Sequence, residues 1–228
     1  AGGVHQFAPM VKLLWQLPFQ KKITLEVKAA LNQLDYYEGY AGLTTADFNA
    51  DPYQRYVASQ LDNMNSNAKT YYAKLHTEFN SNIKNTLTLY GNMFTRDWYK
   101  LDKVNGANLN EIVSKAYGTP NNLAIYKGTA AGEITYKSND RAYYAYGLQN
   151  QTDLDFTTNF LNKKIDHDLK VGFKFHYDKI NRDQYTHDYN QAIGGVLTPG
   201  DTEFNADRNQ ITKGAAVYFE ESATINNF

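Results

Sequence analysis

The chain contains five arginines, and their chemistry is the most specific feature of the sequence. Arg96, Arg141, Arg182 and Arg208 lie near the ends of expected strands, and Arg55 lies in a polar segment between two of them. A guanidinium group is planar and always charged, and its fork of N–H donors matches a carboxylate or a phosphate in a bidentate contact. Arginines gathered at one end of a sheet therefore predict a site that recognises an anion.

Acidic neighbours offer a structural alternative for these arginines. Asp97, Asp140, Asp183 and Asp207 each stand next to one of them in the sequence, so the arginines could simply form ion pairs. Adjacent residues on a strand, however, point to opposite faces of the sheet. This geometry weakens pairing within each dipeptide, and both interpretations stay open at this point.

The segment 167–185, HDLKVGFKFHYDKINRDQY, indicates the kind of element that must position these residues. Its apolar Leu169, Val171, Phe173, Phe175 and Tyr177 alternate with polar residues. A period of two is typical of a strand with one apolar and one polar face. Strands of this kind are expected at 10–17, 22–40, 67–79, 83–100, 139–160, 165–186 and 208–221.

Two kinds of connection join the expected strands. Short turns are expected at 18–22, 80–82 and 161–164. Long polar loops are expected at 41–66, 101–138 and 187–207, with a short helix at 107–118 inside the second loop. The alternation of short and long connections predicts an up-and-down meander, and several strands exceed the about 9–11 residues that cross a bilayer. We therefore predict an all-β fold, an antiparallel up-and-down transmembrane β-barrel.

The predicted orientation turns the apolar faces to lipid and the polar faces to the lumen. If the alternation is unbroken, Arg96, Arg141, Arg182 and Arg208 all lie on the polar, inward face. A soluble β-sandwich is the alternative, in which the apolar residues would pack on a second layer of protein. The expected number of strands is odd, whereas bacterial single-chain barrels have an even number. Either one strand is unrecognised, or the chain is part of a larger barrel.

Composition narrows the function classes further. The formal net charge of −1 gives no basic field, so a nucleic-acid partner is not expected. Cysteine is absent, which excludes thiolate metal sites, and a solvated role is favoured for the histidines at 176 and 187. No phosphate loop, nucleophile elbow or carboxylate pair above chance occurs. We therefore expect a protein that is not an enzyme, with no cofactor and no resident metal.

Several ordered motifs carry a resemblance to a known family. The stretches YYEGYAGLTTADFNADPYQRY at 36–56, NMFTRDWYKLDK at 92–103 and HDLKVGFKFHYDKINRDQYTHDY at 167–189 together resemble TonB-dependent outer-membrane receptors, most closely the ferric dicitrate receptor group. The resemblance spans about residues 22–220. It implies a barrel of 22 strands in the bacterial outer membrane, with residues 1–228 forming a middle part of it.

The resemblance also implies partners and a ligand. It implies a plug domain, which contacts the TonB complex, and closing strands, neither of which is recognisable in these residues. The ligand would be an anionic iron chelate such as ferric citrate or another siderophore, with iron present only inside the chelate. Arg55 and Arg96 lie in or beside matching blocks, and Arg182 matches less closely. Other readings remain a small eight-stranded outer-membrane barrel with a structural or adhesion role, and a soluble sugar-binding β-domain.

Overall fold

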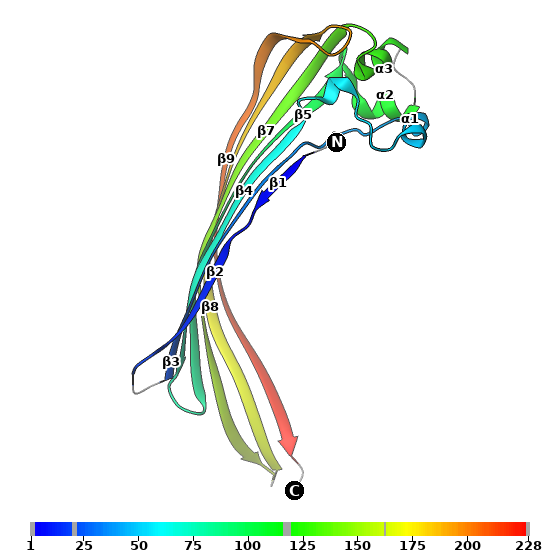
Figure 1. Cartoon of the computed structure of the whole chain (residues 1–228). Helices are drawn as coiled ribbons and strands as arrows, with labels where there is room; N and C mark the ends of the chain where they lie inside the picture. The colour runs from blue at the N-terminus through cyan, green and yellow to red at the C-terminus, as the bar shows by residue number, and fades with distance from the viewer. Residues whose placement is uncertain (1–2, 20–21, 116–119, 162, 227–228) are drawn as a thin grey trace.

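A single antiparallel sheet forms most of the molecule (Figure 1). The computed structural model describes residues 3–19, 22–115, 120–161 and 163–226. The strands are β1 (Val4–Phe7), β2 (Met10–Leu17), β3 (Lys22–Tyr36), β4 (Asn63–Glu78), β5 (Ile83–Val104), β6 (Ala107–Asn108), β7 (Gly132–Phe160), β8 (Lys163–Gln191) and β9 (Leu197–Asn226). The helices are α1 (Thr45–Ala50), the 3-10 helix η1 (Val57–Ser59), α2 (Leu109–Lys115) and α3 (Pro120–Lys127).

The order of the strands confirms the predicted meander. Neighbours in the sheet follow the order β1-β3-β4-β5-β7-β8-β9, while β2 also pairs with β3 and β6 pairs with β5. Each of the seven expected strands overlaps one strand of the sheet, and the strand expected at 10–17 is β2. The additional strands are β1 and β6. Along the same edge of β3, β1 is followed by β2. Pro9 separates them, because proline has no N–H to donate to a ladder.

The connections confirm two of the three expected long loops. We call the end of the sheet that carries residues 37–62 and 105–131 the loop end, and the opposite end the turn end. The long loop expected at 187–207 is wrong, because β8 runs to Gln191 and β9 begins at Leu197. Pro199 pairs with Tyr189 inside this hairpin. A proline is tolerated there because the other side of β9 is an unpaired edge among the described residues.

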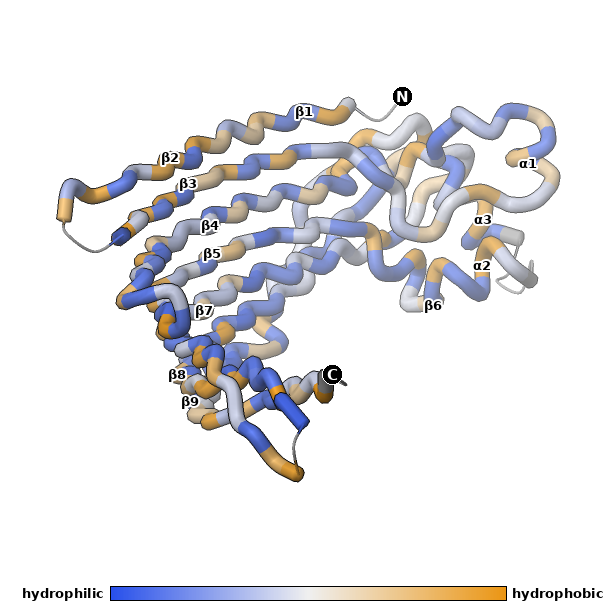
Figure 2. The backbone as a smooth tube through the Cα atoms, turned by 90° about the horizontal axis from the view of Figure 1, so that it is seen from below, coloured by the Kyte–Doolittle hydropathy of each residue, from blue (hydrophilic) through white to orange (hydrophobic). Residues whose placement is uncertain are grey.

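The two faces of the sheet differ in chemistry along most of its length. Cross-strand partners lie on the same face, so the register places the apolar residues together and the polar residues together. The face that we call the belt face carries Leu25, Val27, Leu75, Leu87, Leu89, Tyr146, Leu148, Val171, Phe173, Phe175, Val217 and Phe219. The polar face carries Glu26, Lys28, Lys74, His76, Thr86, Thr88, Tyr90, Gln149, Lys174, His176 and Asp178. Figure 2 shows the resulting alternation of hydrophobic and hydrophilic positions along the strands.

Away from the loop end, no second layer of protein covers the belt face among the residues that the structure describes. Val171, Phe173 and Phe175 expose 39%, 36% and 56% of their surface. A soluble sandwich would bury these side chains. The structure therefore does not support the sandwich alternative. No helix of the described residues is long and apolar enough to cross a membrane.

The sheet is open, which does not match the closed eight-stranded alternative. In the described ranges β9 pairs only with β8, and β1 and β2 pair only with β3. Two edges of the sheet therefore carry unpaired backbone N–H and C=O groups. Unpaired edges of long strands are unfavourable in isolation, which fits a sheet that forms part of a larger wall.

The buried core lies at the loop end, where the helices gather beside the sheet (Figure 1). Leu101, Ile134 and Tyr136 of the sheet have the same strand parity as the belt and pack with Ile125 and Tyr126 of α3. The predicted helix at 107–118 is confirmed as α2, whose Ile112 is buried in this core, while 116–118 lie outside the described residues. We call this group of helices, loops and strand ends the loop cluster.

Candidate functional site

Four of the five arginines form one row across the sheet. Arg96 of β5 pairs with Arg141 of β7, Arg141 pairs with Arg182 of β8, and Arg182 pairs with Arg208 of β9. Their shared register places all four side chains on the polar face near the loop end. Adjacent strands lie about 4.8 Å apart, so the row spans about 14 Å. The predicted common face of these residues is therefore confirmed, and we call them the arginine row.

Little in the described part of the chain neutralises the arginine row. Arg141 donates hydrogen bonds to Asn139 Oδ1 (3.1 Å) and Tyr143 Oη (3.2 Å). The Nε atom of Arg182 is buried and has no hydrogen-bond partner among the described residues. Among the described residues, the arginine that forms an ion pair is Arg55, and its partner is Asp62. Like charges on directly opposed strand positions are unfavourable, so the row would be stabilised by a bound anion.

The neighbouring aspartates lie on the opposite face. Asp140 pairs with Asp183, and Asp183 pairs with Asp207, on the belt face one residue closer to the loop end. Asp97 belongs to the same level and accepts a hydrogen bond from Ser138 Oγ at 2.9 Å. The ion pairs that the sequence left open within each Arg-Asp dipeptide are therefore not formed. The sheet carries cations on one face and carboxylates on the other at nearly the same height.

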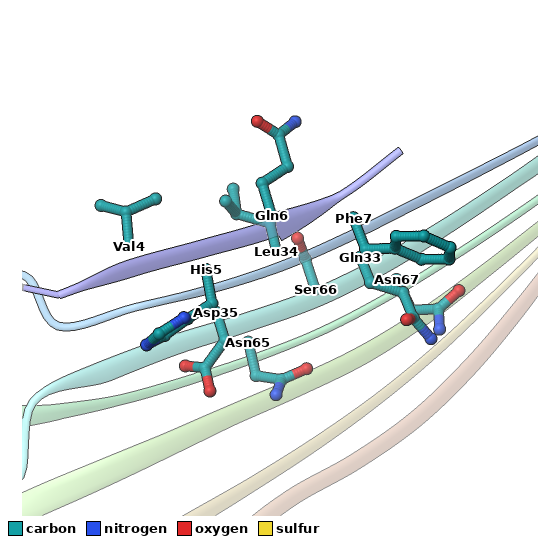
Figure 3. A pocket seen from close by; sticks show the side chains of 10 residues that line it. All are labelled: Val4, His5, Gln6, Phe7, Gln33, Leu34, Asp35, Asn65, Ser66 and Asn67. Atoms are coloured by element: carbon teal, nitrogen blue, oxygen red, sulfur yellow. The ribbon is translucent and has the colours of Figure 1, made fainter. Parts of the chain in front are cut away.

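The aspartate level continues to the first edge of the sheet. His5, Asp35 and Asn65 are cross-strand partners, and Figure 3 shows their side chains projecting to the same side of β1, β3 and β4. Asp35 accepts a hydrogen bond from Asn63 Nδ2 at 2.6 Å. His5, Asp35 and Asn65 help to line a cavity of about 620 Å³ beside β1. Its walls belong to both faces of the sheet, because it lies at an unpaired edge.

Arg55 lies apart from the arginine row, in the loop cluster. Its guanidinium donates to the carbonyl oxygens of Ser59 and Asp62, the latter at 3.1 Å, and lies 3.9 Å from the carboxylate of Asp62. These contacts hold the turn of η1 together. The structure thus brings together four of the five arginines predicted for ligand binding, and places the fifth on the other side of the sheet.

A buried carboxylate fastens the loop cluster to the sheet. Asp62 is fully buried and accepts hydrogen bonds from the backbone N–H groups of Leu101 (2.6 Å) and Tyr40 (3.2 Å). Burial raises the pKa of Asp62 to about 6, while these hydrogen bonds and Arg55 act in the opposite direction. At neutral pH the carboxylate is largely ionised, at a cost in desolvation.

A second carboxylate joins two helices of the loop cluster. Asp47 of α1 lies 2.7 Å from Lys127 Nζ of α3 and accepts hydrogen bonds from Tyr56 and Thr44. Lys127, followed by these two hydroxyl donors, lowers the pKa of Asp47 to about 2. The two helices are therefore held by contacts that are complete at neutral pH.

The polar face also holds a chain of side-chain hydrogen bonds that the sequence did not reveal. Tyr90 Oη lies 2.6 Å from His176 Nδ1, and His176 Nε2 lies 2.8 Å from Asp178 Oδ2. Tyr90 and His176 are far apart in the sequence, and only the register of β5, β7 and β8 brings them together. No group of three or more His, Cys, Asp or Glu able to hold a metal ion occurs among the described residues.

Comparisons with known proteins identify the fold. No family model matches the sequence, and no curated protein matches it. Among solved structures, the ferric citrate transporter FecA in its unliganded form matches with a TM-score of 0.71 at 16% identity, over 99% of this chain and 28% of the FecA chain. The chain thus shares the fold of a segment of FecA and spans less than a third of the length of that chain.

Two further matches are weaker. The ferric-catecholate import receptor Fiu from E. coli K12 matches in its open form with a TM-score of 0.35, at 9% identity, over 97% of this chain and 44% of the Fiu chain. Its closed form matches with a TM-score of 0.33, at 9% identity, over 97% and 41% of the two chains. These two scores are too low to show a common fold.

Proposed function

We propose that this chain forms part of the wall of an outer-membrane, TonB-dependent transporter that takes up an anionic iron chelate, such as ferric citrate or another siderophore. The fold shared with FecA supports this proposal. The observation that carries it is the arginine row, because four cationic side chains lie in register on one face and have few internal partners.

The chemistry of the row suits a polycarboxylate better than a neutral ligand. Each guanidinium can donate two parallel hydrogen bonds to one carboxylate. A span of about 14 Å, set by the strand spacing, lets several carboxylates of one chelate bind at once. Hydrogen bonds to charged groups contribute about 1.5–3 kcal/mol each. Two well-placed arginines thus supply enough free energy to select an anionic chelate from solution.

In the proposed transporter, the two faces of the sheet have different surroundings. The belt face would contact the hydrocarbon of the membrane, and the polar face would line the lumen. A plug domain in that lumen would connect the wall to the TonB complex. The ligand would then meet the arginine row at the loop end of the polar face before it moved toward the turn end.

A titration with ferric citrate tests the proposal. In the intact protein in detergent, the double substitution Arg96→Ala and Arg182→Ala should weaken binding at least about 100-fold, because it removes two charge-assisted contacts. Lys84→Ala is the matched control, since it removes a positive charge from the turn end of the same face. Unchanged ferric citrate affinity in a double variant that folds as the parent does would refute the proposal.

A further inference from the structure

Tyr90, His176 and Asp178 form an ordered chain of donors and acceptors on the polar face. The distances are 2.6 Å from Tyr90 Oη to His176 Nδ1 and 2.8 Å from His176 Nε2 to Asp178 Oδ2. The tautomer of His176 that donates from Nε2 to Asp178 presents the lone pair of Nδ1 toward Tyr90. A carboxylate that fixes the tautomer in this way is the usual outer partner of a metal-binding histidine.

The separation of the two donor atoms matches the bite of an octahedral metal ion. Metal–ligand bonds of about 2.0–2.1 Å place two adjacent donors about 2.9 Å apart. Tyr90 Oη and His176 Nδ1 are already 2.6 Å apart. A metal ion can therefore replace the proton that the two atoms now share, with only a small movement of the side chains. A phenolate oxygen and an imidazole nitrogen are both ligands that iron accepts in proteins.

Gly147 makes this arrangement possible. It lies between Tyr90 and His176 in the register of β5, β7 and β8. A Cβ atom built at Gly147 would lie 2.2 Å from Tyr90 Oη. The absence of a side chain lets the Tyr90 ring lie across β7 and reach His176. Any side chain at this position would force the Tyr90 ring to shift.

The surroundings favour an anionic ligand. Lys174 Nζ lies 5.8 Å from the centre of the Tyr90 ring. The His176 side chain is 30% exposed, so the pair is open to the polar face. Tyr90 lies six positions from Arg96 along β5, and at about 3.3 Å per residue this places the pair about 20 Å from the arginine row on the same face. A chelate held at the loop end would meet Tyr90 and His176 further toward the turn end.

We infer that Tyr90 and His176, positioned by Asp178, form a two-donor site for ferric iron that is still bound to its chelator. The chelate must offer two adjacent coordination positions, because these residues supply only two donors. Binding replaces two water ligands of the ferric ion with Tyr90 Oη and His176 Nδ1, and the phenol proton passes to solvent. The iron stays ferric. This inference extends the proposed function from recognition of charge to direct contact with the metal.

Ferric nitrilotriacetate is the probe for the experiment, since this chelator leaves two adjacent positions of the octahedral ion to water. Added to the intact protein in detergent, it should produce the visible charge-transfer absorption of a ferric phenolate. Tyr90→Phe keeps the ring and should abolish this absorption. Tyr72→Phe is the matched control, because Tyr72 is the cross-strand neighbour of Tyr90. The hydroxyl of Tyr72 donates a hydrogen bond to Glu26 Oε1 at 2.5 Å. This control should leave the absorption unchanged.

Two more variants separate a ligand role from a merely structural one. Asp178→Asn keeps both donors and should weaken iron affinity about 10–100-fold, the usual effect of losing such an outer partner. Gly147→Ala also keeps both donors and should remove the absorption by displacing the Tyr90 ring. An equal absorption in Tyr90→Phe and the parent protein, or none in the parent, would overturn the inference.

The outcome is independent of the test of the arginine row. If the double arginine variant loses ferric citrate but keeps the charge-transfer absorption, the iron site stands and is reached by the small probe directly. If the parent binds ferric citrate but shows no such absorption with ferric nitrilotriacetate, the arginine row stands and the iron site is wrong.

Discussion

Leu89 and Asn92 provide a direct test of which face of the sheet meets lipid. Leu89 lies on the belt face of β5 between Ala73 and Leu148, and it exposes 49% of its surface. Asn92 lies three positions along on the polar face, between Thr70 and Ala145. Both sites have uncharged cross-strand neighbours, so an arginine introduced at either one meets no charge directly opposite. Only the medium that the face contacts differs between them.

If the proposed orientation is correct, Leu89→Arg should destabilise the protein in a bilayer by about 2–4 kcal/mol, the cost of an arginine near the middle of a bilayer on the lipid side of a barrel. This cost lowers the ratio of folded to unfolded protein by about 30- to 700-fold, since 1.4 kcal/mol is a factor of ten. Asn92→Arg should change stability by less than about 0.5 kcal/mol, as an ordinary solvated substitution does.

Reversible unfolding by guanidinium in phosphatidylcholine vesicles, followed by tryptophan fluorescence, measures both variants. Equal costs for Leu89→Arg and Asn92→Arg would show that both faces meet the same medium, and a larger cost for Asn92→Arg would reverse the orientation. Either result would refute the lumen assigned to the arginine row. If one variant fails to insert into the vesicles, the refolding yields of Leu89→Arg and Asn92→Arg are compared instead.

Two further predictions concern the loop cluster. Because burial raises the folded-state pKa of Asp62 to about 6 from its ordinary 3.8, its contribution to stability grows as pH falls through 6 and is fully present below the unfolded value. The free energy of opening of the loop cluster, measured by hydrogen exchange, should therefore rise by about 1 kcal/mol between pH 7 and pH 5. Asp62→Asn should abolish that dependence, and an unaltered profile would contradict the assignment. Tyr136→Phe removes a buried hydroxyl that donates to Ala58 O (2.6 Å) and accepts from Leu61 N (3.1 Å). It should cost about 1–3 kcal/mol, and a thermal midpoint equal to that of the parent would show that those groups find other partners.

The strand pattern of this protein could be read from its sequence because both faces meet uniform surroundings. The alternation from Leu169 to Tyr177 runs without a break because one face is continuously apolar and the other continuously polar. The register between β7 and β8 is regular over their whole length. The common face of the four arginines followed from parity alone, since no irregularity lies between each of them and the belt. Local chemistry and global fold agree along these strands.

The structure of the loop end was predicted less well from the sequence, for physical reasons. Residues 187–207 are polar and include Pro199, Gly194 and Gly195, which are the signs of a loop. In the structure they extend the hairpin of β8 and β9 to the loop end, where Tyr189 and Leu197 pack against the buried core and the period of two is lost. The register also shifts near Gln184 and His187. Residue patterns identify strands by a regular alternation between faces, and the register shifts interrupt this alternation there.

Tyr90 and His176 were missed for a different reason. They come from strands that are not adjacent, and the residue between them is a glycine. A contact across a missing side chain leaves no periodic signal in either strand. The sequence showed only that His176 shares a face with Lys174 and Asp178. The partner on β5 becomes visible once the register is known.

The order of the charged dipeptides contains information about both topology and orientation. The sequence reads Arg-Asp at 96–97, Asp-Arg at 140–141, Arg-Asp at 182–183 and Asp-Arg at 207–208. The order reverses with each change of strand direction, so an antiparallel sheet in register collects all the arginines on one face and all the aspartates on the other. This arrangement alone does not decide which face is the lumen, since cationic residues would also suit anionic lipid headgroups. Under the proposed function, the belt face meets lipid and the arginine face lines the lumen, because the apolar side chains lie on the aspartate side. An arginine at position 89 or 92 therefore tests the premise on which the anion site, the iron site and the path between them all depend.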